Sequence, residues 1–168
     1  MPTPDDRDGL APMLEANRRY AAEFDTIVAS LPPSPRLAVL TCMDARIDPL
    51  PLLGLALGDA HVIRNAGALA TDDAIRSLII SQRVLGTSEV LVVGHTSCGL
   101  LGFDEAAMRE RLVGETATDA GLALLAFDDL AASVARQVDA IRRHPWTMDV
   151  LVRGLIVDVA TGRLEPVG

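Results

Sequence analysis

The sequence predicts an α/β fold: an open, mainly parallel β-sheet flanked by helices, with a C-terminal strand at its edge. Short apolar runs such as 37–40 and 89–93 alternate with longer segments of helical periodicity. Continuous apolar runs are typical of strands buried on both faces of a parallel sheet. With 168 residues, 49% of them hydrophobic, the chain is expected to form one domain with a substantial core.

The first half of the chain predicts two helices and two strands. Helical spacing of apolar residues ends at the prolines of 31–35, and a second helix can be capped by Thr71 or Asp72 and ended at Gly86. In chain order we expect a helix over 10–28, strands over 37–40 and 62–63, and a helix over 71–85. We therefore divide the single domain 1–168 into a helical arm over 1–35 and an α/β core over 36–168.

The second half continues the alternation. A strand over 89–93 precedes a long helical region from 104 to 143, interrupted near 114–119 and strongest over 122–141. Further strands are expected over 150–159 and 164–167, joined by a turn at Thr161-Gly162-Arg163.

Composition excludes several classes of function. The formal net charge of −8 and the pI of about 4.7 disfavour binding to nucleic acid or to anionic membranes, which usually requires a basic patch. No apolar run approaches the roughly 20 residues of a membrane span, and residues 1–10 lack the apolar core of a signal peptide. Two cysteines are compatible with a reducing compartment. We expect a cytoplasmic protein.

Three soft metal ligands follow two of the predicted strands. Cys42 comes after the run 37–40, and His95 and Cys98 come after the run 89–93. In open α/β sheets, ligands bind beyond the carboxyl ends of the strands, where strand order reverses. Zinc favours thiolate and imidazole ligands, and three protein ligands with one position for water are typical of catalytic zinc. We predict one Zn²⁺ per chain at this edge.

Asp44 and Arg46 occupy alternate positions directly after Cys42. Two arrangements follow from this spacing. Asp44 can be a fourth zinc ligand and close the site, or it can pair with Arg46 and leave the fourth position to water. In the second arrangement, the carboxylate can accept a hydrogen bond from that water and orient it.

Taken together, three segments resemble the signature segments of the β-class carbonic anhydrases, most closely those of the compact prokaryotic clade. They are Cys42-x-Asp44-x-Arg46, Arg64-Asn65-Ala66-Gly67 and His95-x-x-Cys98-Gly99. The resemblance implies zinc ligation by Cys42, His95 and Cys98, with Asp44 as a ligand in a closed state only. It also implies catalytic roles for Asp44 and Arg46, a substrate loop that includes Gly67, and a homodimer or homotetramer.

The activity implied by this resemblance is the reversible hydration of CO₂ to bicarbonate and a proton, which would make the protein a carbonate dehydratase and a lyase. One alternative is hydrolysis of CS₂ or carbonyl sulfide at the same zinc site. Another is a domain without catalytic activity that is held together by structural zinc.

Overall fold

The computed structural model describes residues 10–24 and 36–168. Contacts divide the chain into two units, Met1–Ser30 and Leu31–Gly168. In the first unit, helix α1 (Leu10–Ala22) has no buried residue. It ends before the predicted residue 28, and 25–28 lie outside the described residues. Among the described residues, no helix is both long and apolar enough to cross a membrane. The division into an arm over 1–35 and a core over 36–168 stays a prediction.

The second unit contains a five-stranded sheet in the order β2-β1-β3-β4-β5. The first four strands are parallel and the short last strand is antiparallel to its neighbour. The bounds are β1 Leu37–Cys42, β2 Ala60–Asn65, β3 Glu89–His95, β4 Leu151–Val157 and β5 Leu164–Val167. Every residue of β1 is buried, as its continuous apolar character predicts. The predicted fold class is confirmed, including the C-terminal edge strand.

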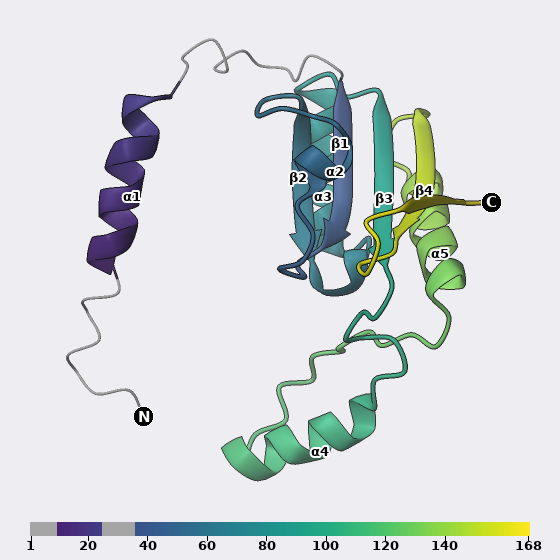
Figure 1. The fold of residues 1–168 in the computed structure, drawn as a ribbon. Helices are drawn as coiled ribbons and strands as arrows, with labels where there is room; N and C mark the ends of the chain where they lie inside the picture. Colours follow the sequence, from purple (N-terminus) through teal and green to yellow (C-terminus); the bar gives the residue numbers. More distant parts are fainter. Residues whose placement is uncertain (1–9, 25–35) are drawn as a thin grey trace. The chain divides into compact units, whose positions relative to one another are not determined.

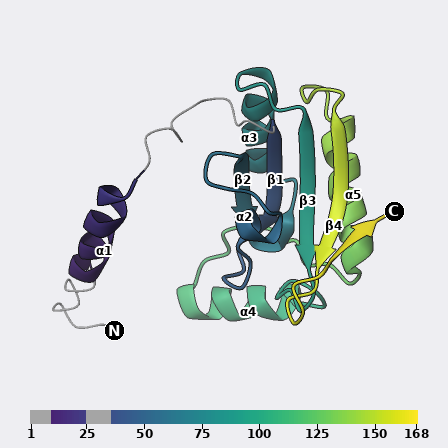
Figure 2. The ribbon, with the colours of Figure 1, turned by 45° about the horizontal axis from the view of Figure 1, so that its top comes forward.

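Two helices cover one face of the sheet. Helix α3 (Asp72–Arg83) packs on β1 and β2, and helix α5 (Leu130–Arg143) packs on β3 and β4 (Figures 1 and 2). A single apolar cluster joins both helices to the sheet and includes Leu40, Leu78 and Val138. A second cluster, on the other face, contains Val39, Cys42 and Cys98. The short helix α2 (Pro49–Leu52) contributes Leu52 to it.

Helix α5 lies very close to β3 and β4 because both strands present a glycine to it. A Cβ atom at Gly94 would lie 2.6 Å from Val134 Cγ2, and one at Gly154 would lie 2.7 Å from Val134 Cγ1. Real Cβ atoms do not approach other atoms so closely. The two glycines therefore determine how near the helix can sit to the sheet.

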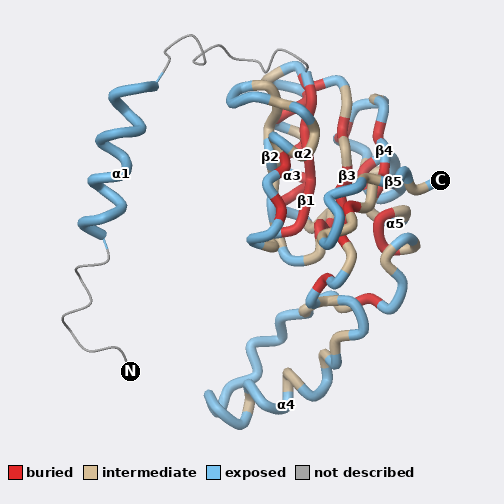
Figure 3. The backbone as a smooth tube through the Cα atoms, viewed as in Figure 1, coloured by how far each residue is buried: buried red, intermediate tan, exposed pale blue. Residues whose placement is uncertain are grey.

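The segment between β3 and α5 differs from the helix that the sequence predicted there. Helix α4 (Glu105–Thr116) has no buried residue, and Figure 3 shows the helix as a mixture of exposed and intermediate stretches. The predicted helix over 122–141 is wrong for 122–129, since α5 begins only at Leu130, with Asp129 as its N-cap. Side-chain bonds compete with helix formation there. The Glu105 carboxylate accepts hydrogen bonds from the backbone N–H groups of Leu124 (2.6 Å) and Ala126 (3.3 Å).

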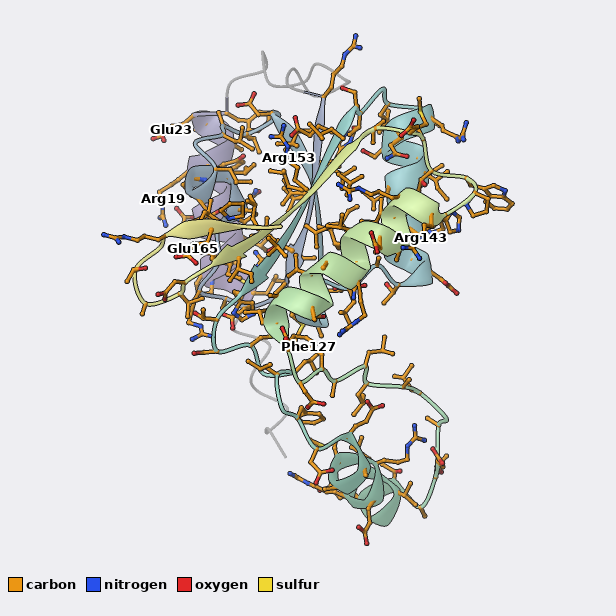
Figure 4. The ribbon with its side chains drawn as sticks, turned by 90° about the vertical axis from the view of Figure 1, so that its right-hand side faces the viewer. Arg19, Glu23, Phe127, Arg143, Arg153 and Glu165 are labelled. Atoms are coloured by element: carbon orange, nitrogen blue, oxygen red, sulfur yellow. The ribbon has the colours of Figure 1, made fainter. Side chains whose placement is uncertain are left out.

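Phe127 anchors the end of this segment in the second apolar cluster. It is buried and forms an isolated parallel bridge with Leu101. Its N–H donates to the Leu100 carbonyl at 3.1 Å, and its carbonyl accepts from the Gly102 N–H at 2.8 Å. Figure 4 shows Phe127 at the point where the chain passes from the α4 segment into α5. The end of the β3–α5 connection is thus hydrogen-bonded to Leu100 and Gly102, which directly follow Cys98 in the chain.

Candidate metal centre

The predicted ligands meet at the carboxyl ends of two adjacent strands. Cys42 is the last residue of β1 and His95 is the last residue of β3. These strands are neighbours, and the chain passes from β1 to β2 on one side and then to β3 on the other. The strand order therefore reverses between the two ligands. Cys98 lies in the turn that follows β3, so all three residues border the switch point of the sheet.

The three ligand atoms form a compact group. Among the described residues, the Sγ atoms of Cys42 and Cys98 and a ring nitrogen of His95 lie within 4.8 Å of one another, and all three residues are buried. Both cysteines are free thiols. His95 Nδ1 lies 2.9 Å from the Thr96 carbonyl. Since a carbonyl can only accept, Nδ1 carries the proton and donates it, which leaves the Nε2 lone pair for a metal.

This donor set fits zinc. His95 is 1% exposed, and its Nε2 is a buried atom without a hydrogen-bond partner among the described residues, an arrangement that costs free energy unless the atom is satisfied. Burial raises the pKa of the Cys98 thiol. A bound divalent cation removes both costs, because it accepts the imidazole lone pair and deprotonates a coordinating thiol.

Gly67 borders the same group. It lies in the 3₁₀ turn Ala66–Ala68 with φ +82°, and its N–H donates to Cys42 Sγ at 3.4 Å. A Cβ atom there would meet Leu100 Cδ1 at 3.0 Å and both Leu69 Cγ and Phe127 Cε1 at 3.3 Å. Glycine is therefore required twice, for the left-handed backbone and for the close approach of apolar side chains.

Asp44 and Arg46 form a two-point ion pair beside the ligands. Arg46 Nε donates to Asp44 Oδ1 at 2.8 Å, and Arg46 Nη2 donates to Asp44 Oδ2 at 2.7 Å. The Arg46 backbone N–H also donates to Asp44 Oδ1, at 2.9 Å. Asp44 Oδ2 lies 3.9 Å from His95 Nε2. The carboxylate thus borders the metal centre while it is bound by arginine.

This pair determines the charge state of both groups. The hydrogen bonds from Arg46 hold the pKa of the Asp44 carboxyl well below its ordinary value. In turn, Asp44 raises the pKa of the Arg46 guanidinium. Both groups are therefore charged at neutral pH, and Asp44 is available as a hydrogen-bond acceptor only.

Backbone carbonyls complete the site in a way that residue types do not reveal. Arg46 Nη2 also donates to the Ser97 carbonyl at 3.1 Å, and Ser97 has a left-handed backbone with φ +54°. Arg46 thereby joins the loop of Cys42 to the loop of Cys98. Sequence reasoning missed this link and the role of the Thr96 carbonyl, because every residue type has a backbone carbonyl.

Fold and site together define an α/β protein with a Cys₂His metal centre at the strand ends. A family model described as carbonic anhydrase matches residues 37–119. The chain is 42% identical over 155 residues to β-carbonic anhydrase 1 of Mycobacterium tuberculosis, covering 92% of this chain and 94% of that protein. The chain belongs to the β-carbonic anhydrase family.

Two further proteins are similar to this chain over most of its length. The crystal structure of a carbonic anhydrase from Streptococcus mutans superposes with a TM-score of 0.87 at 44% identity, covering 95% of this chain and 97% of that one. A carbon disulfide hydrolase from Acidithiobacillus thiooxidans is 34% identical over 173 residues, covering 90% of this chain and 85% of that protein. Proteins of both names therefore resemble nearly the whole chain.

Proposed function

We propose that the protein catalyses the zinc-dependent, reversible hydration of CO₂ to bicarbonate and a proton. The observation that carries this proposal is the buried Cys42, His95 and Cys98 group, with ligand atoms within 4.8 Å of one another, in a chain 42% identical to a protein named β-carbonic anhydrase 1. In this reaction a water oxygen forms a bond to the carbon of CO₂ while the π pair of one C=O bond moves onto its oxygen. One O–H bond of the water breaks, and its proton passes to buffer.

The residues of the chain have distinct parts in this proposal. Cys42, His95 and Cys98 hold zinc, which when bound supplies the Lewis acidity that makes water nucleophilic at neutral pH. Asp44 accepts a hydrogen bond from the reacting water and orients its lone pair. Arg46 holds the Asp44 carboxylate through two hydrogen bonds and so keeps it from acting as a fourth ligand. Gly67 lets the substrate loop approach Cys42.

Metal analysis and parallel hydration assays test this function. The purified protein should hold about one zinc ion per chain, and Cys98→Ser and His95→Ala should lose most of it. Asp44→Asn should keep zinc and lose about 10- to 100-fold in kcat, the usual cost of removing a group that tunes a metal site. The matched control is Asp73→Asn, because Asp73 forms an exposed pair with Arg76 on α3 and should leave kcat unchanged.

Hydrolysis of CS₂ or carbonyl sulfide is the second candidate, and the similarity to a carbon disulfide hydrolase favours it. Assays of the same preparation with CO₂, carbonyl sulfide and CS₂ separate the two activities. Zinc-loaded protein that turns over CS₂ but not CO₂ would replace the leading proposal. Loss of all three activities, with no exchangeable water in a cobalt-substituted site at any pH, would instead indicate structural zinc.

We also propose a cytoplasmic homo-oligomer, a homodimer or homotetramer. Two ligand thiols need a reducing compartment to stay available. Helix α1 carries an apolar stripe of Leu10, Met13 and Leu14, which is suited to packing against a second copy. Light scattering of the full chain measures the assembly, and a monomer at micromolar concentration would contradict it.

A further inference from the structure

Arg64 connects strand β2 to the loop that leaves β1. Arg64 Nε donates to the Cys42 carbonyl at 3.0 Å, and Arg64 Nη2 donates to the Asp44 carbonyl at 2.7 Å. The sheet brings these residues together, since Thr41 of β1 is in register with Arg64 of β2. One guanidinium therefore binds two carbonyls of the loop that carries both a metal ligand and the carboxylate beside it.

Two backbone–backbone hydrogen bonds also hold this loop. The Asp44 carbonyl accepts a second bond, from the Ile47 N–H at 3.1 Å. The Met43 N–H donates to the Asn65 carbonyl at 2.9 Å, which extends the β1–β2 ladder by one bond. Met43 itself is 67% exposed, so packing of its side chain does not hold the loop. The two carbonyls bound by Arg64 lie on either side of Met43. The arginine thus holds the chain at the point where it leaves the sheet.

The orientation of two functional side chains depends on this stretch of backbone. The Cys42 Sγ atom belongs to the compact metal-ligand group, and the Asp44 carboxylate is bound by Arg46. Arg64 and Arg46 consequently hold the same residue at two points, one at its main chain and one at its side chain. A rotation of the peptide that carries the Asp44 carbonyl would break its hydrogen bonds from Arg64 and from the Ile47 N–H.

We propose that Arg64 is a positioning residue that holds the loop 42–46 so that Cys42 meets the metal and Asp44 faces Arg46. This inference rests on the proposed zinc site and goes beyond it, because the hydrogen bonds of Arg64 within the described residues go to the Cys42 and Asp44 carbonyls and not to the ligand atoms or the Asp44 carboxylate. Arginine is suited to the task, since its planar fork presents two donors in a rigid geometry and lysine offers a single point charge.

The test compares Arg64→Gln with Arg76→Gln. Arg76 is the matched control because it forms only an exposed pair with Asp73 on α3. Two quantities are measured on the full-length, zinc-loaded protein: the rate at which zinc passes to a chelator, and kcat and KM for CO₂. Arg64→Gln should release zinc about 10- to 100-fold faster than the control and lower kcat by a similar factor. KM should change little, because the proposed role of Arg64 is to hold the loop through the Cys42 and Asp44 carbonyls and not to bind substrate.

Arg64→Lys provides the second variant. It retains the charge but lacks the rigid fork of two donors, so its rate of zinc release should lie between those of the wild type and Arg64→Gln. Equal zinc release by Arg64→Gln and Arg76→Gln would overturn the inference, and so would failure of both Arg64 variants to fold. Zinc release does not depend on turnover, so a wild type inactive towards CO₂ would remove the proposed function and leave this inference intact.

Discussion

The substitution Gly67→Ala should lower the free energy of unfolding by more than a glycine-to-alanine change at an unpacked left-handed position does. Gly67 has φ +82°, and its N–H donates to Cys42 Sγ. An L-residue in this conformation costs about 1–2 kcal/mol, which is offset by about 0.4–1 kcal/mol because alanine restricts the unfolded chain. The backbone contribution alone is therefore about 1 kcal/mol.

Packing adds to this cost at Gly67. The new Cβ would lie 3.3 Å from both Leu69 Cγ and Phe127 Cε1. Both side chains are buried, at 7% and 6% exposure, so neither can move into solvent. Inserting a methyl group into a packed site typically costs about 1–3 kcal/mol. The total for Gly67→Ala is about 2–4 kcal/mol, with the Leu100 side chain absorbing part of the third contact.

The matched control is Gly54→Ala. Gly54 has φ +68°, but nothing lies within 4 Å of a Cβ built there. The free energy of unfolding of this variant should therefore fall only by the backbone contribution of about 1 kcal/mol. Urea unfolding of the zinc-free proteins measures both values, and each kcal/mol should also lower Tm by about 2–4 °C. Gly67→Ala should release zinc faster as well, because displacement of the turn weakens the hydrogen bond to Cys42.

Equal destabilisation by the two variants, within about 0.5 kcal/mol, would refute the close packing over Gly67. Unchanged zinc release in a destabilised Gly67→Ala would separate the two effects. It would show that the N–H···S bond does not contribute to metal retention.

Four other perturbations test further parts of the structure. Gly154→Ala should destabilise by about 1–3 kcal/mol, because its Cβ would meet Val134 at 2.7 Å. The exposed helical Gly114, with no such contact, should instead gain about 0.5–1 kcal/mol on the same change, as thermal unfolding can show. Hydrogen bonds from the backbone N–H groups of Leu124 and Ala126 hold the pKa of the Glu105 carboxyl below its ordinary value. These bonds should therefore persist at neutral pH and be lost as the pH falls through that lowered pKa. Hydrogen exchange measures this, and Glu105→Gln should abolish the pH dependence. Zinc removal should lower stability by about 2.7 kcal/mol relative to free zinc at about 100 times Kd; an unchanged Tm would show that the folded chain does not bind it.

Local patterns in the sequence account for the sheet and for the ligand set. The run that becomes β1 is buried throughout, and the run that becomes β3 is buried apart from the partly exposed Glu89 and Leu91. Cys42 and His95 end those two strands. Parallel strands place their carboxyl ends at one edge, so the meeting of the ligands follows from the order of strands and helices. The helix predicted from residue 122 was wrong because the Glu105 carboxylate binds backbone N–H groups 19 and 21 residues away. Helical periodicity carries no information about such bonds.

The sequence by itself determined the fold class, the three metal ligands and the presence of Asp44 and Arg46 beside them. Only the tertiary structure decided which carbonyls those groups bind: Thr96 for the proton of His95, Ser97 for Arg46, and the loop after β1 for Arg64. The physical reason is that ligand preference belongs to side-chain chemistry, which is written in the residue types. Orientation depends on backbone carbonyls, which every residue has and which folding alone brings within reach.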